Sequence, residues 1–538
     1  MEKIEINTNL ACSKTKFHGL LTDCIMTKNI KILILLIGCS MASISCSHDK
    51  KTEQSTPNII YFLADDLGYG ELGAYGQSII KTPHIDALAK NGMKFTQHYS
   101  GAPVCAPARY VFLTGKHAGH AYIRGNDEWN ERGDVWNYEE VYHNPGLEGQ
   151  RPIPKNTITL GDQLKKAGYT TSIFGKWGLG APESDGIPTL QGFDFFYGYN
   201  CQRQAHNLYP SHLWENETKV LLNNQLVAPR TKLDSLADPL KEESYIKFTQ
   251  NDYAPQKIQE KALSFIEANK DTPFFMYYAS PLPHLPLQAP KTYVDKYREI
   301  LGEEDPYLGD DSYFPNRYPR ATYAAMISYL DHQLGELVKK LKEKGIYENT
   351  VIIFSSDNGP TYLGGVDYDY FESSKPFSNG YGRTKGFVYE GGIRVPLIVS
   401  WPNSIKPGTQ SKHLSAFYDL MPTISDLAGV PPPNSIDGIS FKSTLLDQEQ
   451  KQHEFLYWEF PSYHGQQAVR MGKWKGVRKN IFDGNLDIEL YNLETDIKEQ
   501  LDIASQHPNI VAHIKRIMVE EHEPASNKKF KFKQLGDL

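Results

Sequence analysis

The sequence predicts an α/β fold, in which helices flank a large central mixed sheet and a smaller C-terminal α+β subdomain follows. Short apolar runs, typical of strands buried on both faces, alternate along the chain with helical segments. Polar residues directly follow several of these runs, where ligands bind in open α/β sheets. The length of 538 residues also exceeds what a single core usually supports, which favours a second, smaller unit.

The elements are expected in the following order. Strands are predicted at residues 58–64, 95–99, 170–174, 273–279, 351–355 and 395–401. Helices are predicted from Pro83 to Gly92, over residues 160–167, and over 321–344, where leucines recur at helical spacing up to Gly345. After the Pro-rich residues 431–434, strands at 454–460 and 467–478 and a helix at 508–521 are expected. Residues 126–156 and 200–255 are polar and weakly periodic, so we interpret them as insertions near the ligand-binding edge.

The N-terminal region has the pattern of an export signal. Lys28 and Lys31 precede the apolar run 32–38, which is too short to span a bilayer, and small residues follow. The pattern resembles a bacterial lipoprotein signal; we expect acylation at Cys46, with Cys39 as the other candidate and a cleaved signal without lipid as the alternative. Because residues 1–25 lack signal character, Met26 is the better start.

The expected organisation is therefore an N-terminal extension and lipoprotein signal (1–46), a polar tether (47–57), a large α/β domain (58–445) and a C-terminal subdomain (446–538). Such a signal implies a location in the periplasm or on the outer-membrane surface. It also implies that the lipid anchor is the chain's only attachment to a membrane.

Composition excludes some functions. The net charge of −7 argues against a general nucleic-acid binder. Four of the six cysteines precede residue 47, so Cys105 and Cys201 alone remain in the globular part and no disulfide framework is expected. The 33 tyrosines are compatible with a carbohydrate-facing surface.

The segment Cys105-Ala106-Pro107-Ala108-Arg109 combines a thiol, a helix start and a guanidinium. We place Pro107 at the start of a short helix with Cys105 just ahead of it, because proline suits the first helical position. The N–H groups of a helix N-terminus and the fork of Arg109 both suit an oxyanion. From these residues alone, a nucleophile held against an anion and a buried cysteine before a core helix remain equally open.

Two pairs of residues with oxygen ligands follow predicted strands: Asp65-Asp66 and Asp357-Asn358. Adjacent carboxylates repel unless a cation lies between them, and all-oxygen sets favour Ca²⁺ or Mg²⁺. Turn chemistry explains either pair alone, but two pairs after buried strands favour a metal site.

Three basic residues and one histidine could serve a multiply charged oxyanion. Lys176, Lys385 and Arg109 could neutralise it, and His284 follows a strand and could act as a general acid. Taken singly, a lysine is more often a solvated surface charge and a loop histidine is more often structural.

Together, these blocks resemble the type I sulfatases. Cys105-Ala106-Pro107-Ala108-Arg109 with Leu113-Thr114-Gly115 resembles the family signature, and the other matching blocks, in order, are Asp65-Asp66, Gly175-Lys176-Trp177, Pro283-His284, Asp357-Asn358-Gly359 and Lys385 before Glu390-Gly391-Gly392. The resemblance covers roughly residues 57–478. It implies an alkaline-phosphatase-like fold and a cysteine that a maturation enzyme oxidises to formylglycine.

The resemblance also assigns roles. It implies that Ca²⁺, in preference to Mg²⁺, binds Asp65, Asp66, Asp357, Asn358 and the modified Cys105. It further implies that the formylglycine and the sulfate are held by Arg109, Lys176, His284 and Lys385. One hydroxyl of the hydrated aldehyde would attack sulfur, the second would later expel sulfate, and His284 would protonate the leaving oxygen.

Two positions depart from the family pattern. Ala108 stands where serine is commoner, and because Cys105, Pro107 and Arg109 are kept, oxidation is still expected. Gly178 stands two places after Lys176, where the family usually has a histidine that contacts the formylglycine or the sulfate. Two alternatives follow: His206 substitutes for it and binds substrate, or the pocket simply differs at this point.

Three further residues, His117, His120 and Arg124, could line the same edge of the sheet. Of these, Arg124 is predicted to bind substrate together with His206. A purely structural role for the three residues is at least as well supported by the sequence.

The expected function is hydrolysis of a sulfate ester, on a sulfated carbohydrate or an aryl sulfate. One alternative is a phosphate or phosphonate monoester hydrolase, since the same fold serves both reactions. The other is a surface glycan-binding protein without activity, an alternative that rests on Gly178.

Overall fold

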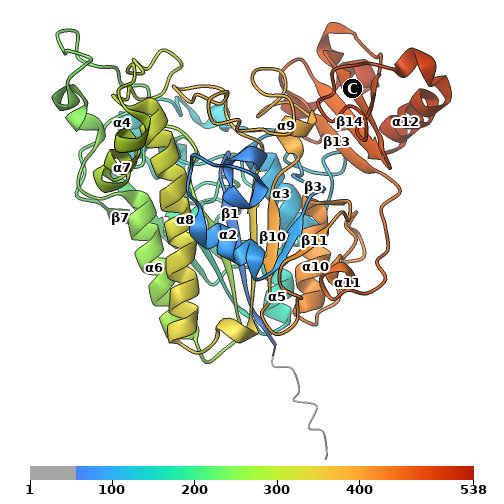
Figure 1. The fold of residues 1–538 in the computed structure, drawn as a ribbon, viewed down its shortest axis with the longest axis horizontal. Helices are drawn as coiled ribbons and strands as arrows, with labels where there is room; N and C mark the ends of the chain where they lie inside the picture. Colours follow the sequence, from blue (N-terminus) through green and yellow to red (C-terminus); the bar gives the residue numbers. More distant parts are fainter. Residues whose placement is uncertain (1–55) are drawn as a thin grey trace, which may run out of the picture. The chain divides into compact units, whose positions relative to one another are not determined.

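The sixteen strands of residues 56–538, the part of the chain that this computed structural model describes, form a ten-stranded sheet, a four-stranded sheet and a two-stranded sheet (Figure 1). The large sheet has the order β11-β2-β10-β9-β1-β8-β4-β5-β6-β7. Its strands are β1 (Asn58–Ala64), β2 (Met93–Phe95), β4 (Thr170–Lys176), β5 (Phe195–Tyr199), β6 (His212–Glu215), β7 (Thr218–Leu221), β8 (Phe274–Ala279), β9 (Thr350–Ser356), β10 (Leu397–Ser400) and β11 (Thr409–Ser411). The predicted signal and the tether up to residue 55 lie outside the described residues.

The centre of the large sheet is parallel. β9, β1, β8, β4 and β5 pair in parallel in that order, whereas β10 and β6 join antiparallel on either side. The prediction of a mixed sheet is therefore confirmed. Since parallel strands share a direction, the carboxyl ends of these five strands meet at one edge, which is where the polar blocks follow.

Each face of the sheet is covered by helices because successive side chains of β1 point to opposite sides. Ile59, Tyr61 and Leu63 enter one hydrophobic cluster, and Ile60 and Phe62 enter the other. The first cluster contains residues of α3 (Cys105–Thr114), α5 (Leu160–Lys166) and α10 (Leu420–Leu427). The second contains residues of α2 (Pro83–Lys90), α6 (Ala254–Asn269), α7 (Lys291–Leu301) and α8 (Pro319–Glu343). Figure 1 shows α6 and α8 side by side, with α3 and α10 beyond β10.

A second, smaller sheet follows in the C-terminal region, as predicted. It is antiparallel, with β13 (Leu456–Phe460), β14 (Gln466–Met471), β15 (Trp474–Lys479) and β16 (Glu489–Asn492) in sequence order, and α12 (Pro508–Glu520) packs on it through Ile514, Ile517 and Met518. Buried Lys475 of β15 pairs with Glu390 of α9 (Glu390–Ile393) at 2.9 Å and with Glu499 at 2.9 Å. These charges tie the small sheet to the segment that carries Lys385.

Several element boundaries differ from the predictions. The strand expected at 95–99 is divided between β2 and β3 (His98–Tyr99), which pairs with β12 (Ser415–Ala416) in a separate sheet. The strand expected at 467–478 is two strands, because Gly472, with φ 53°, makes a turn between β14 and β15. The insertion expected at 200–255 contributes β6 and β7 to the large sheet, and α6 and α7 were not predicted.

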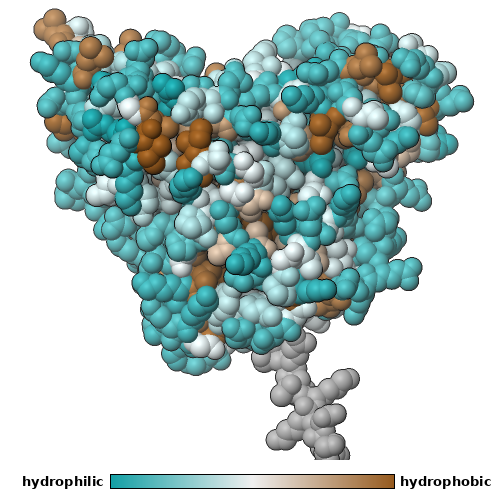
Figure 2. Space-filling view, in the orientation of Figure 1, coloured by the Kyte–Doolittle hydropathy of each residue, from teal (hydrophilic) through white to brown (hydrophobic). Residues whose placement is uncertain are grey.

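The remaining helices are short: α4 (Tyr138–His143) lies in the first insertion, and α11 (Lys442–Leu445) precedes the small sheet. Among residues 56–538, no helix has both the length and the apolar character needed to cross a bilayer. On the face shown in Figure 2, hydrophobic residues lie in small groups separated by hydrophilic ones.

Candidate active site

The ends of β1 and β9 bring the pairs Asp65-Asp66 and Asp357-Asn358 together, and we call these four residues the acidic cluster. Asp65, Asp66, Asp357 and Asn358 are all buried, and the Asp66 N–H donates to Oδ1 of Asp357 at 3.1 Å. Asn358 Nδ2 donates to Oδ1 of Asp66 at 2.7 Å. Asp66 has φ 67°, a conformation that is uncommon outside glycine and is often found where function requires it.

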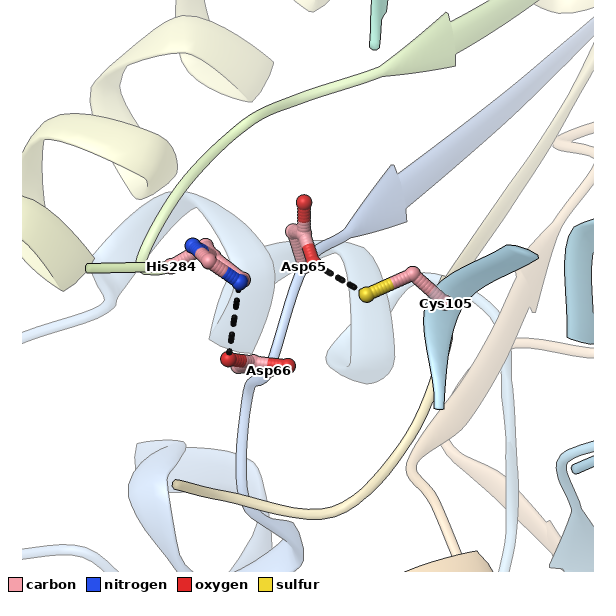
Figure 3. Close-up of side chains that lie close together, drawn as sticks. All are labelled: Asp65, Asp66, Cys105 and His284. Atoms are coloured by element: carbon pink, nitrogen blue, oxygen red, sulfur yellow. Dashed lines mark hydrogen bonds and ion pairs between the residues drawn. The ribbon is translucent and has the colours of Figure 1, made fainter. Parts of the chain in front are cut away.

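Cys105 lies at the N-terminus of α3 and points into this acidic cluster (Figure 3). Its Sγ atom is 3.5 Å from Oδ1 of Asp65 and 3.5 Å from Nζ of Lys176. Burial raises the pKa of the thiol to about 12, and the nearby carboxylate of Asp65 acts in the same direction. The helix begins at Cys105 itself rather than at the predicted Pro107, since Val104 is the extended residue before it.

Each of the three predicted basic residues pairs with a carboxylate of the cluster. Arg109 Nη2 lies 2.9 Å from Asp357 Oδ2 and 3.3 Å from Asp65 Oδ2, and its Nη1 donates to the Lys176 carbonyl. Lys176 Nζ is 2.6 Å from Asp65 Oδ2, and Lys385 Nζ is 2.7 Å from Asp66 Oδ2. A cation bound by the carboxylates would compete with these three basic groups and leave them available to an anionic substrate.

Two histidines close one side of the cluster. His284 Nδ1 lies 2.7 Å from the Leu285 carbonyl oxygen, to which it therefore donates, and its Nε2 faces Asp66 Oδ2 at 3.6 Å. His206 stacks on His284, with ring centroids 5.1 Å apart and an angle of 18° between the rings. Burial and the positive charges of the lysines lower the pKa of both imidazoles well below the usual value.

The acidic cluster fits a hard divalent cation. Burial and the neighbouring carboxylates of Asp65 and Asp66 raise the pKa of Asp357 to about 7, whereas Lys176, His284 and Arg109 lower that of Asp65 against the effect of burial. Oδ1 of Asn358 is buried without a hydrogen-bond partner among the described residues. A cation would neutralise the repulsion and take up this unused oxygen, as an oxygen-rich site for Ca²⁺ or Mg²⁺ does.

Arg124 is not brought to the cluster. Its guanidinium pairs with buried Glu459 of β13 and donates to the carbonyls of Gly119, Ala121 and Glu523. The expectation that Arg124 binds substrate is therefore wrong, because these protein groups already take up all three of its nitrogens.

His117 and His120 likewise pair with carboxylates outside the acidic cluster. Nε2 of His117 lies 2.9 Å from Glu521, and Nδ1 of His120 lies 2.9 Å from Asp437. Both histidines therefore have the structural role that the sequence also allowed.

The space beside Gly178 is filled by Gln202. A Cβ atom at position 178 would lie 2.3 Å from Nε2 of Gln202, and the backbone of Gly178 has φ 79°. Neither Gln202 nor Tyr313, whose ring lies 5.3 Å from that of His206, was predicted. Both lie in weakly periodic loops, where the sequence carries no signal that identifies them.

Family and structure comparisons agree with this geometry. The family model described as Sulfatase matches residues 57–430, and the model described as N-sulphoglucosamine sulphohydrolase, C-terminal, matches residues 381–524. Arylsulfatase A of Homo sapiens is 31% identical over 438 residues, which is 78% of this chain and 74% of that protein. N-acetylgalactosamine-6-O-sulfatase of Bacteroides thetaiotaomicron is 26% identical and covers 90% of this chain and 96% of its own length.

A solved structure resembles this chain in fold and in sequence. The crystal structure of Ps i-CgsB has a TM-score of 0.67 at 26% identity and covers 87% of this chain and 94% of its own. The ordered motifs, their convergence at one edge of the sheet and the match over more than half of the sequence lead to one conclusion. The chain belongs to the sulfatase family and is a sulfatase with an alkaline-phosphatase-like fold.

Proposed function

We propose that this sulfatase releases inorganic sulfate from a sulfated carbohydrate, using residue 105 in its formylglycine form and a Ca²⁺ ion. The observation that carries the proposal is the position of Cys105, 3.5 Å from both Asp65 and Lys176 at a helix N-terminus. A thiol there with a pKa of about 12 is a weak nucleophile at neutral pH and a soft ligand among hard ones. An oxygen-bearing side chain suits the position better.

The two absent groups have defined partners. Ca²⁺ would be held by Asp65, Asp66, Asp357 and Asn358, and would polarise oxygens of the ester and of residue 105. Oxidation of Cys105 requires a maturation enzyme; the hydrated aldehyde would supply one hydroxyl that accepts the sulfuryl group and another that releases it. Mg²⁺ is the second choice of metal, because the buried oxygens form a protein cage rather than a site that keeps several waters.

The residues around Cys105 would act on the anionic ester. Arg109 and Lys176 flank Cys105 and would stabilise the charge that develops on the sulfate oxygens. Lys385 is held at the same cluster by its ion pair with Asp66.

The leaving oxygen needs a proton, and Nε2 of His284 is the candidate donor. That imidazole is neutral without substrate. A bound sulfate ester would raise its pKa, because a nearby negative charge favours the protonated ring.

The carbohydrate preference rests on relatives. The Bacteroides thetaiotaomicron protein is named for N-acetylgalactosamine 6-sulfate esters, and Ps i-CgsB has a structure with k-i-k-neocarrahexaose. The test is release of inorganic sulfate from 4-nitrophenyl sulfate and from sulfated mono- and disaccharides of galactose, N-acetylgalactosamine, glucosamine and fucose. The protein must first be shown by mass spectrometry to carry the aldehyde, and Cys105→Ala is the control.

Each other outcome has a defined meaning. Faster hydrolysis of 4-nitrophenyl phosphate than of 4-nitrophenyl sulfate would favour the phosphate or phosphonate monoester alternative. Saccharide binding without release of sulfate, in protein that carries the aldehyde, would favour the glycan-binding alternative. Hydrolysis of 4-nitrophenyl sulfate alone would reject the carbohydrate preference and leave the sulfatase reaction in place.

The proposed location is the periplasm or the outer-membrane surface, with a lipid anchor at Cys46. Partitioning into detergent that disappears in a Cys46→Ala variant would support the anchor. Unchanged partitioning would reject it.

A further inference from the structure

The acidic cluster opens to solvent beside Lys385. The Lys385 side chain is 18% exposed, whereas those of Asp65, Asp66, Arg109, Lys176 and His284 are at most 4% exposed. A substrate that places its ester against Cys105 therefore has the rest of its structure close to Lys385. The side chains around Lys385 decide what that structure can be.

An aromatic rim borders this opening, formed by Tyr362, Tyr381, Phe387 and Tyr463. The ring of Tyr463 packs on the residue after Lys385: a Cβ atom at Gly386 would lie 2.8 Å from Cε2 of Tyr463. From there the rings continue in contact, with centroid distances of 5.0 Å (Tyr463 to Phe387), 5.2 Å (Phe387 to Tyr381) and 5.4 Å (Tyr381 to Tyr362).

Two rings of the aromatic rim are open to solvent. Tyr381 is 70% exposed and Tyr463 is 41% exposed, although both are large aromatic residues. Tyrosine joins an apolar ring face to a hydroxyl, which suits a ligand that is itself apolar on one face and polar at its edges. A pyranose ring is such a ligand, because its axial C–H groups form a weakly positive apolar face.

The backbone that carries Tyr463 is held in an unfavourable conformation. Tyr463 and the next residue, His464, have φ 48° and φ 67°, a region that costs free energy for residues other than glycine. Their neighbour Gly465, with φ 77°, completes the turn between β13 and β14. This turn places the Tyr463 ring against Gly386, next to Lys385.

The side of the cluster formed by the two histidines also carries an aromatic ring. Tyr313 packs against the stacked histidines, with its ring 5.3 Å from His206 and 6.3 Å from His284. Burial and the nearby Asp66 raise the pKa of Tyr313 to about 12 although Lys385 opposes them, so its hydroxyl stays protonated at neutral pH.

We propose that the aromatic rim binds the pyranose ring that carries the sulfate ester, with Tyr463 and Tyr381 as its stacking surfaces. This inference rests on the proposed sulfatase reaction and says which residues hold its substrate: the rings stack on the sugar that is the leaving alcohol. Because inorganic sulfate has no ring to stack, the rim contributes to binding of the saccharide and not to binding of sulfate, whereas a nitrophenyl ring can itself stack on tyrosine.

The experiment compares a substrate with an inhibitor in variants of the full chain that carry the aldehyde. The substrate is whichever of the sulfated monosaccharides named above is hydrolysed fastest, and the competitive inhibitor is inorganic sulfate, which has no ring. Tyr463→Ala and Tyr381→Ala should each raise KM for the saccharide about fivefold to tenfold, and kcat should change little. Neither variant should change the inhibition constant of inorganic sulfate more than about twofold.

Two controls make the result specific. Tyr463→Phe keeps the ring and should retain most of the saccharide affinity, whereas a loss equal to that of Tyr463→Ala would overturn stacking. Tyr370, 40% exposed but packed against Arg320 and Phe371 instead of the aromatic rim, provides Tyr370→Ala as the matched exposed tyrosine and should have no effect.

The outcomes separate this inference from the proposed function. Equal losses of affinity for the saccharide and for inorganic sulfate, or no loss for the saccharide, would overturn a role for the rim while sulfatase activity stands. Hydrolysis of 4-nitrophenyl sulfate without hydrolysis of any saccharide would also overturn it. Failure on every sulfate ester would refute the proposed reaction itself.

Discussion

The imidazole of His206 lies parallel to that of His284, with ring centroids 5.1 Å apart, although the two residues come from different loops of the chain. Nδ1 of His284 is fixed by its hydrogen bond to the Leu285 carbonyl, and the ring of His206 covers one face of the imidazole. His206 therefore positions the imidazole that we propose as the proton donor.

The His206→Ala variant should lower kcat/KM for 4-nitrophenyl sulfate about tenfold, the size expected when an aromatic contact is lost and its partner becomes mobile. His206→Phe, which keeps the stack, should recover most of that loss. If His206→Phe is as slow as His206→Ala, the ring acts through a proton or a hydrogen bond instead. His143→Ala, at a histidine whose side chain is 68% exposed, is the control.

Removal of the cation should lower both activity and stability. Without it, Asp65, Asp66 and Asp357 repel one another in a buried site, where charges are poorly screened. Incubation with EGTA should abolish release of 4-nitrophenol and lower the unfolding midpoint in calorimetry. Ca²⁺ should restore both better than Mg²⁺; full recovery with Mg²⁺ alone would contradict the choice of metal.

Arg124 should prove to be a structural residue. Arg124→Ala leaves buried Glu459 without its guanidinium partner, which typically costs about 3–5 kcal/mol of unfolding free energy. Denaturant titration should show this loss, while KM for 4-nitrophenyl sulfate at low temperature should stay unchanged. Arg516→Ala, at an exposed pair with Glu520, should change stability by less than about 0.5 kcal/mol.

The family histidine should not be tolerated at position 178 by simple substitution. Gly178 and Gly168 have almost the same φ, 79° and 80°, but only Gly168 has free space for a Cβ atom. Gly168→Ala therefore measures the backbone cost, on the order of 1–2 kcal/mol. Gly178→Ala should cost more, because of the overlap with Gln202.

Adding Gln202→Ala should remove the excess and leave a loss equal to that of Gly168→Ala. Urea unfolding of the four proteins measures the difference. Equal losses for the two single glycine variants would show that Gln202 moves aside without cost.

Asp331 should make stability depend on pH. Burial raises its pKa to about 7, and its Oδ1 accepts the N–H groups of His84 and Ile85 at the start of α2. Because the folded pKa exceeds the unfolded value near 3.8, the contribution is fully present below about pH 4 and is lost as pH rises through 7.

Asp331→Asn keeps the acceptor but cannot ionise. It should therefore be more stable than the parent at pH 8, by on the order of 4 kcal/mol, because each pKa unit of the shift is worth about 1.4 kcal/mol, and should match it near pH 4. Thermal melts across this range measure the effect, and a parent curve without that decline would refute the shift.

The local sequence was sufficient to predict the residues that act at strand ends. Asp65 and Asp357 follow runs whose apolar character predicts buried parallel strands, and parallel strands necessarily bring their carboxyl ends together. Lys176 follows from the same logic, because it is the last residue of β4, and the pairing of β4 with β8 and of β8 with β1 brings it to the acidic cluster. Cys105 lies instead at the N-terminus of α3.

The features that the sequence did not predict depend on long-range contacts. Arg124 becomes structural only because Glu459, 335 residues later, lies against it. Gln202 lies at the site because a glycine at 178 leaves room for its side chain. Tyr313 belongs to the site because its ring packs on His206. The periodicity of α6 was overlooked because it begins at the edge of an irregular insertion.

The buried Lys475 of β15 has a consequence for how the protein tolerates truncation. Glu390, its partner, comes five residues after Lys385, so the small sheet fixes the strand-to-helix segment from which that ammonium reaches Asp66. A chain shortened after residue 445 would keep every proposed metal ligand, yet would remove Lys475 from buried Glu390, which keeps its pair with Arg394, and would lose Tyr463. Residues 446–538 thus stabilise one wall of the active site, and a shortened enzyme would have lower activity even if it folded.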